Sequence, residues 1–146
     1  MVWAGLPTHK NNQRRSIGIT PFKRLLQIPE IHFYSLQKGP AEVELEEVGK
    51  FVRDLAPQLD DFADTAAAIA RLDLVITVDT AVAHLAGAMN KPAWVLLPFA
   101  PDWRWGLSQS ESAWYPTLKL FRQTQRGLWK DVFDQVALEL ANRLRN

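Results

Sequence analysis

The sequence predicts an α/β fold, a Rossmann-like three-layer sandwich in which a parallel sheet lies between two layers of helices. Two observations carry this prediction. Short apolar segments alternate along the chain with amphipathic ones, which is the pattern of strand–helix–strand units with parallel strands. In addition, residues 74–78 and 93–97 are continuously apolar, as is typical of strands buried on both faces of a parallel sheet. The length of 146 residues, 47% of them hydrophobic, suits a single domain over residues 1–146.

Strands are expected where a short apolar run ends in polar or turn-forming residues. The first run, residues 1–4, leads into a polar loop over residues 5–16. The second run ends just before Gly39 and Pro40, which break the chain. The expected strands are residues 1–4, 31–36, 74–78, 93–97 and 118–121.

Helices are expected where capping residues precede apolar side chains at helical spacing. Thr20 and Pro21 suit the N-cap and the first position of a helix that Pro29 ends. Asp64 and Thr65 suit the cap of an alanine-rich helix. The expected helices are residues 20–28, 42–55, 64–72, 80–89 and 128–144, and residues 101–116 are expected to be irregular.

Composition excludes several classes of protein. The absence of cysteine excludes disulfides, thiolate metal sites and cysteine nucleophiles, and it suits the cytoplasm, where we expect the protein. The net charge of +1 gives no electrostatic case for nucleic acid. No apolar run approaches the ~20 residues of a membrane span, and the polar residues from Thr8 onward argue against a signal peptide. The three histidines lack metal-ligand spacing, so no metal is expected.

The sharpest functional signal lies where the strand over residues 74–78 runs directly into a helix. Asp79, Thr80 and Ala81 form this turn, and His84 lies one helical turn beyond Thr80. The first N–H groups of a helix lack internal partners, so this turn could cradle a phosphate, which the small Ala81 would let approach closely. The ordinary alternative is that Asp79 or Thr80 is merely an N-cap and that His84 has only structural contacts.

Two further polar segments follow the first two expected strands. The loop over residues 5–16 carries Lys10, Arg14 and Arg15, and the second strand is followed by Gln37 and Lys38. Arginine can hold phosphate oxygens with two parallel hydrogen bonds, whereas lysine acts as a point charge. The alternatives are a solvated basic loop and an ordinary turn. Because the carboxyl ends of parallel strands share one edge of the sheet, the three segments together predict an anion site there.

Tryptophan is abundant, and the positions of four of the six residues are unusual. Trp94, Trp103, Trp105 and Trp114 lie close together in the sequence. They could form a packed aromatic cluster in the core, or a wall against which a sugar or a base stacks. Both interpretations stay open at the level of sequence.

Several of these segments together resemble a known bacterial domain. They are residues 2–7, 10–11, 15–17, 35–40, 61–67, 74–98, 101–105 and 114–116, which span nearly the whole chain. The combination resembles the glycosyltransferase-like domain that often follows tetratricopeptide repeats. It is also similar to the C-terminal half of the ADP-heptose–lipopolysaccharide heptosyltransferases. This resemblance implies one lobe of a GT-B fold that binds a nucleoside-diphosphate sugar without a metal or other cofactor.

The resemblance also implies roles for particular residues. Asp79, Thr80, Ala81 and His84 match the family signature that meets the diphosphate and the donor sugar. Arg15, or alternatively Arg14, matches the basic residue that faces phosphate. Gln37 and Lys38 stand at the second strand end, where nucleotide contacts are expected. Two departures, Leu6 in place of a common Asn and Gly18 in place of a common Pro, concern the shape of the loop.

A GT-B enzyme has two Rossmann-like lobes with the active site between them. The acceptor-binding half, which supplies the catalytic base in the heptosyltransferases, precedes this kind of sequence. The chain is therefore expected to be a piece of a longer protein, the product of a split gene or a stand-alone remnant. No catalytic residue is assigned to it.

Two functions from different classes follow from these observations. The first is donor binding for the transfer of a hexosyl or heptosyl group, which requires an acceptor domain or a partner chain. The second is a non-catalytic binding module derived from a glycosyltransferase. In that case the face left by the missing half, to which Trp103, Trp105 and Trp114 could contribute, would favour self-association. The genes that surround this one would help to separate the two.

Overall fold

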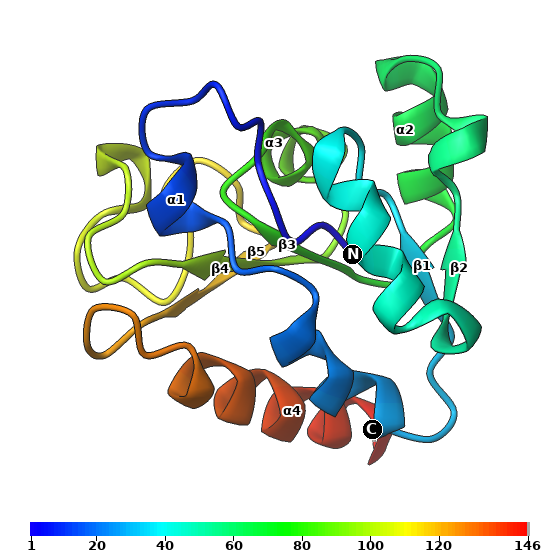
Figure 1. The fold of residues 1–146 in the computed structure, drawn as a ribbon. Coiled ribbons are helices and arrows are strands. Elements are labelled where there is room, and N and C mark those ends of the chain that lie inside the picture. Colours follow the sequence, from blue (N-terminus) through cyan, green and yellow to red (C-terminus); the bar gives the residue numbers. More distant parts are fainter. Residues whose placement is uncertain (146) are drawn as a thin grey trace.

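The computed structural model describes residues 1–145, and its centre is a sheet of parallel strands (Figure 1). The strands β1 (Phe33–Ser35) and β2 (Val52–Asp54) form one pair. The strands β3 (Val75–Val78), β4 (Ala93–Leu97) and β5 (Leu118–Arg122) form a second, three-stranded group in the order β3-β4-β5. All of the pairings between these strands are parallel, so the carboxyl ends of the strands point to the same edge.

The first two residues of the chain join the two groups of strands. The backbone N–H of Val2 donates to the oxygen of Ile76 over 3.0 Å, and Val78 donates to the oxygen of Val2 over 3.1 Å. On the other side, Leu36 donates to the oxygen of Met1 over 3.0 Å. Numbered along the chain with this first segment included, the strand order is 3-2-1-4-5-6, the order of Rossmann folds. The expected fold class is confirmed.

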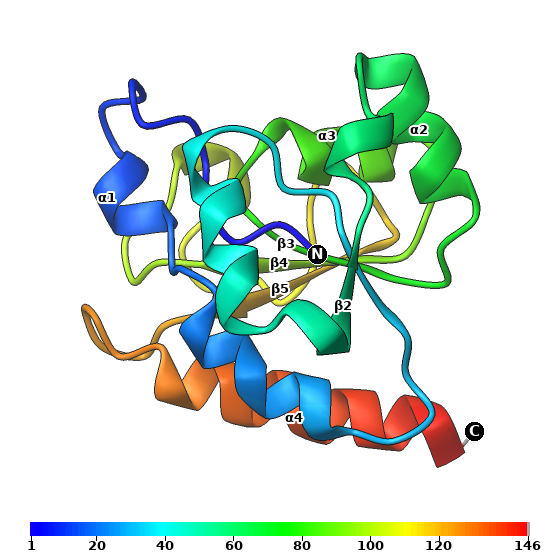
Figure 2. The same cartoon turned by 45° about the vertical axis from the view of Figure 1, so that its right-hand side comes forward.

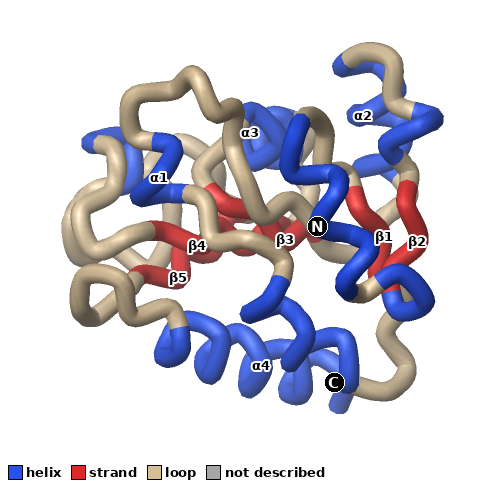
Figure 3. Tube along the Cα trace, viewed as in Figure 1, coloured by secondary structure: helices blue, strands red, loops and turns tan. Residues whose placement is uncertain are grey.

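Helices cover both faces of the sheet, as Figures 1 and 2 show. The long helix α4 (Lys130–Arg145) and the 3₁₀ helix η1 (Thr20–Gln27) lie together on one face, where Phe22 meets Phe133 edge to face at 4.9 Å. The helices α2 (Phe62–Ala70) and α3 (Ala81–Ala88) lie on the other face. The tube in Figure 3 shows the strands as a band between these two layers.

A hydrophobic core lies on each face of the sheet, and side chains that alternate along the strands contribute to one core or the other. Ile76, Val78, Trp94 and Leu96 face the α4 side, whereas Val75 and Val95 pack with the α2 and α3 side. Burial on both faces explains why β3 and β4 are continuously apolar.

One expected helix is wrong. Residues 42–55 form two short 3₁₀ helices, η2 (Pro40–Glu47) and η3 (Gly49–Phe51), followed by β2. Phe51, which the helical spacing placed on the buried face, is exposed. Val52 is buried instead as a strand residue opposite Phe33. A three-residue strand that carries one inward side chain leaves no alternating pattern to detect.

A second expected boundary also differs. The helix α2 begins at Phe62 and is capped by Asp61, not by Asp64 and Thr65. The carboxylate of Asp61 accepts hydrogen bonds from the backbone N–H groups of Ala63 at 2.7 Å and Asp64 at 3.0 Å. Two otherwise unpaired donors are thereby satisfied, which makes Asp61 the stronger cap.

Short helices also occur in segments expected to be irregular. The loop over residues 5–16 contains α1 (Asn12–Arg15), and residues 101–116 contain η5 (Trp103–Trp105). A further 3₁₀ turn, η4 (Ala56–Gln58), follows β2. No helix within residues 1–145 is long and apolar enough to cross a membrane.

The four clustered tryptophans divide into two kinds. Trp94 and Trp105 are buried, in agreement with a packing role. Trp103 is 75% exposed and Trp114 is 60% exposed, and their rings meet edge to face at 6.3 Å. The sequence cluster is therefore half core and half surface.

Candidate functional site

A cavity of about 480 Å³ opens at the carboxyl edge of the sheet, where the first strand segment lies beside β3. In parallel α/β sheets, ligands bind where the strand order reverses direction, and this cavity lies at that point. The three polar segments singled out from the sequence meet there. Five of the seven candidate residues line the cavity: Arg15, Gln37, Lys38, Thr80 and Ala81.

Arg15 at the end of α1 bridges two of the segments. Its guanidinium Nη1 donates to the main-chain oxygen of Asp79 over 2.8 Å, and its Nε has no partner within residues 1–145. Gly5 leaves the space that this side chain fills, because a Cβ on Gly5 would lie 2.7 Å from Arg15 Nη2. Arg14, the alternative cation, is exposed and lies away from this cavity.

Gln37 is fully engaged with the backbone. Its Oε1 accepts from the N–H groups of Trp3 and Ala4, each over 3.0 Å, and its Nε2 donates to the oxygens of Ala4 and Lys38. The residue is only 2% exposed. Gln37 therefore holds the ends of two neighbouring strands together at the floor of the cavity, with its amide already satisfied.

Lys38 brings a second cation to the cavity. Its side chain is exposed, and its Nζ donates to the main-chain oxygen of Ala56 over 2.9 Å. This contact uses one of three donors, so the ammonium group keeps hydrogen-bonding capacity for a ligand.

The N-terminus of α3 contributes backbone donors. Thr80 is the N-cap, but its side chain makes no capping hydrogen bond, and the N–H groups of Ala81 and Val82 have no backbone acceptor within the described residues. The Thr77 hydroxyl donates to the oxygen of Val78, so the Thr80 hydroxyl, 3.0 Å from it, must donate to Thr77. Free N–H groups and the helix dipole favour an anion at this end.

Asp79 faces a second, smaller cavity of about 40 Å³ on the other side of Arg15. The residue is 7% exposed, and its carboxylate receives no hydrogen bond from residues 1–145. Cations of Arg14, Arg15 and Arg104 line the same cavity, together with Asp102. The carboxylate oxygens of Asp79 are not among the fully buried polar atoms, so they are open to this cavity as hydrogen-bond acceptors.

His84 lines neither cavity. Its ring stacks on Trp105 at 5.1 Å, and its Nδ1 lies 3.2 Å from the hydroxyl of Tyr115. Burial lowers the pKa of His84 below its ordinary value, and the nearby carboxylate of Asp79 opposes this shift. His84 is therefore biased toward the neutral imidazole beside the smaller cavity.

Sequence reasoning missed the far wall of the larger cavity. Leu6, Leu36, Leu59, Phe62 and Val82 give it apolar surface, and Asp60 adds a carboxylate. Phe62 is exposed although it is large and apolar, because it sits on the first turn of α2 above the cavity. The turn signal at Asp60 and Asp61, placed before an apolar residue, is the feature that could have located this wall.

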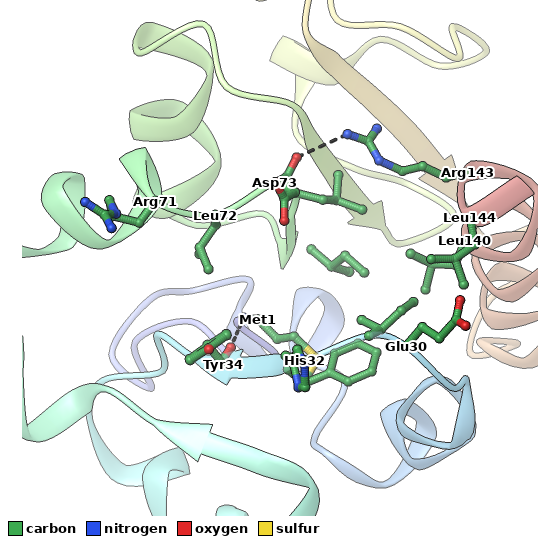
Figure 4. Close-up of a pocket in the computed structure, with 14 residues that line it drawn as sticks. Met1, Glu30, His32, Tyr34, Arg71, Leu72, Asp73, Leu140, Arg143 and Leu144 are labelled. Atoms are coloured by element: carbon green, nitrogen blue, oxygen red, sulfur yellow. Dashed lines mark hydrogen bonds between the residues drawn. The ribbon is translucent and has the colours of Figure 1, made fainter. Parts of the chain in front are cut away.

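Another cavity, of about 460 Å³, lies at the opposite edge of the sheet (Figure 4). Leu140, Arg143 and Leu144 of α4 face the starts of β1 and β3 across it, and Arg143 donates to the main-chain oxygen of Asp73 over 3.2 Å. None of the predicted site residues lines it. No cluster of three or more histidine and carboxylate side chains within residues 1–145 is placed to hold a metal ion.

Comparisons with known proteins support a relationship to glycosyltransferases. Protein FlbA of Caulobacter vibrioides is 33% identical over 152 aligned residues, which cover 96% of this chain and 24% of FlbA. The chain thus spans about a quarter of the length of that relative. No solved structure gives a significant match. Residues 35–101, which run from β1 past the end of β4 and include six of the seven candidate residues, match the model of glycosyltransferase family 9 (heptosyltransferase). The chain is therefore similar, over residues 35–101, to the heptosyltransferase family.

Proposed function

We propose that this chain is the donor-binding domain of a glycosyltransferase and that a nucleoside-diphosphate sugar binds at the carboxyl edge of its sheet. The observation that carries the proposal is the larger cavity, where Arg15, Lys38 and the N-terminus of α3 meet. Two cations and a helix N-terminus are suited to a diphosphate, whereas the adjoining apolar wall is suited to a nucleoside. The similarity to glycosyltransferase family 9 supports the same ligand class.

The ligand would cross the edge of the sheet from the larger cavity to the smaller one. The base would lie against Leu59 and Phe62, and the carboxylate of Asp60 would accept ribose hydroxyls. The diphosphate would receive hydrogen bonds from Arg15, from the N–H groups of Ala81 and Val82, and from the Thr80 hydroxyl, which would turn from Thr77 toward the phosphate. The sugar would then lie beside Asp79, which lines the smaller cavity and whose carboxylate accepts no hydrogen bond within residues 1–145.

In transfer, charge develops on the leaving nucleoside diphosphate. Donors fixed by the fold before the reaction stabilise that charge at no cost of reorganisation, and the hydrogen bond of Arg15 to the main-chain oxygen of Asp79 fixes its guanidinium in this way. Because side chains and a helix N-terminus would balance the charge, we propose that no metal is needed. Nucleotide binding should then persist in EDTA.

A complete reaction also needs a base near the acceptor hydroxyl. We propose that an acceptor-binding domain or partner chain supplies it, and that tetratricopeptide repeats accompany the domain in a cytoplasmic protein. A binding module without transferase activity would share the donor site. Activity of the full-length protein toward an acceptor separates the two functions.

The proposal is tested by thermal unfolding of the chain with ADP-, UDP-, GDP- and TDP-sugars. Saturation at about 100 times the dissociation constant should stabilise the fold by roughly 2.7 kcal/mol for the correct donor. Thr80→Ala should reduce this stabilisation, and Thr20→Ala, which alters an exposed threonine at the start of η1, should not. No stabilisation by any of the four donors at millimolar concentration would overturn the proposal.

A further inference from the structure

The imidazole of His84 is held between two aromatic residues that lie well beyond it in the sequence. Trp105 stacks on one side, with ring centroids 5.1 Å apart and planes inclined by 28°. Tyr115 meets the ring edge to face at 5.7 Å, and its hydroxyl lies 3.2 Å from Nδ1. Trp105 is buried, so this arrangement fixes the plane of the histidine as well as its distance from Tyr115.

The chain around Tyr115 is itself fixed. Its backbone N–H donates to the hydroxyl of the buried Ser112 over 3.2 Å, and its oxygen accepts from Leu118 at the start of β5. Its ring lies directly over Gly87 in α3, where a Cβ would stand only 2.4 Å from Tyr115 Cγ. A side chain at position 87 would push Tyr115 away, so the glycine allows the contact with His84.

The direction of the hydrogen bond follows from the available partners. Within residues 1–145 the Tyr115 hydroxyl has no other hydrogen-bond partner than His84 Nδ1. A phenol proton that donates to Nδ1 leaves the other ring nitrogen, Nε2, to carry the imidazole proton. In the reverse arrangement the phenol proton would have no acceptor within the described residues.

We propose that Tyr115 is a positioning residue that holds neutral His84 in the Nε2–H tautomer. The histidine then presents a fixed hydrogen-bond donor rather than an acceptor. The charged groups that act on it are Asp79, Arg104 and Asp102, all of which line the smaller cavity. The use of this donor toward the sugar or diphosphate rests on the proposed function, whereas the tautomer itself does not.

The tautomer is measured directly by long-range ¹H–¹⁵N correlation spectra of the ligand-free protein at pH 8. We expect His84 to show an unprotonated Nδ1 and a protonated Nε2 in the wild-type protein. Tyr115→Phe keeps the ring over Gly87 but removes the donor, so the Nδ1 signal should shift and the two tautomers should mix. Tyr34→Phe, at the only other tyrosine, is the matched control and should leave His84 unchanged. A protonated Nδ1 in the wild type, or a Tyr115→Phe spectrum identical to it, would overturn the proposal.

Donor binding is then measured with the same variants. Loss of one oriented neutral hydrogen bond corresponds to about 3- to 10-fold weaker binding of the nucleotide sugar in Tyr115→Phe, with no change in Tyr34→Phe. Equal affinity of wild type and Tyr115→Phe would remove the role of His84 in donor binding. A wild-type protein that binds no nucleotide sugar would overturn the proposed function, and the spectra would still decide the role of Tyr115.

Discussion

The guanidinium of Arg15 donates a hydrogen bond of 2.8 Å to the main-chain oxygen of Asp79, 64 residues further along the chain. This contact ties the loop after the first strand segment to the turn between β3 and α3. It therefore spans the place where the strand order reverses, and it holds a cation beside the free N–H groups at the start of α3. The candidate site is built around this link.

Replacing Arg15 should weaken donor binding. Arg15→Ala removes a charge-assisted hydrogen bond to phosphate, worth about 1.5–3 kcal/mol, which is roughly 10- to 150-fold in affinity. Arg15→Lys should recover only part of the loss, since an ammonium group cannot reproduce the planar fork of a guanidinium. The measurement is isothermal titration with the nucleoside diphosphate. Arg53→Ala, at an exposed arginine of β2 outside the cavity, is the control, and an equal loss in both variants would contradict the assignment.

Gly5 should be required for the placement of Arg15. A Cβ at this position would lie 2.7 Å from Arg15 Nη2 and 2.8 Å from Asn12 Oδ1, so Gly5→Ala should displace the guanidinium and weaken nucleotide binding. The stability of the fold should change little, because the atoms that a Cβ would displace are the ends of the flexible Arg15 and Asn12 side chains. Gly49→Ala is the matched change, since no atom of the described residues lies within 4 Å of its new Cβ. Unchanged affinity in Gly5→Ala would show that the position of Arg15 does not matter.

Gln37 should matter for stability more than for chemistry. Gln37→Ala would leave two N–H groups and two oxygens of the backbone without their hydrogen-bond partner. Each of these groups that stays buried and unpaired lowers the free energy of unfolding by about 1–3 kcal/mol. We expect a loss of at least 2 kcal/mol in urea unfolding. Gln58→Ala, at an exposed glutamine, should change stability little. A stable Gln37→Ala protein that fails to bind nucleotide would instead place Gln37 in direct contact with the ligand.

Stability should depend on pH through His84. Burial lowers the pKa of the folded-state histidine below its ordinary value of 6.5, so the unfolded chain takes up a proton that the folded chain resists. The free energy of unfolding should therefore be highest, with respect to His84, above pH 6.5. It should fall as the pH drops through that value toward the lower folded-state pKa. Urea unfolding between pH 5 and 8 should show a shallower decline in His84→Gln than in wild type. His32→Gln, at an exposed histidine, should keep the wild-type slope. Parallel slopes in wild type and His84→Gln would contradict this account.

The strands and the site edge could be predicted because they depend on local signals. Continuously apolar runs located β3 and β4, and polar residues after three strand ends located Arg15, Lys38 and Thr80 at one cavity. The strand β2 could not be found, since only Val52 of its three residues is buried and helical spacing fits the same residues equally well. Nor could local patterns show that the side-chain amide of Gln37 hydrogen-bonds to the backbone, or that Tyr115 contacts His84, 31 residues earlier in the sequence. Both contacts arise from tertiary packing.

The central claim is tested most directly by mapping the binding site of a nucleoside diphosphate on the chain. In ¹H–¹⁵N spectra of the labelled protein, titration should shift the backbone signals of Gly5, Lys38, Phe62, Ala81 and Val82, which line the larger cavity or its edge. The signals of Ala81 and Val82 should move downfield, since their N–H groups would gain an acceptor. Shifts confined to the opposite edge, around Leu72 and Leu144, or no shifts at millimolar nucleotide, would contradict the account.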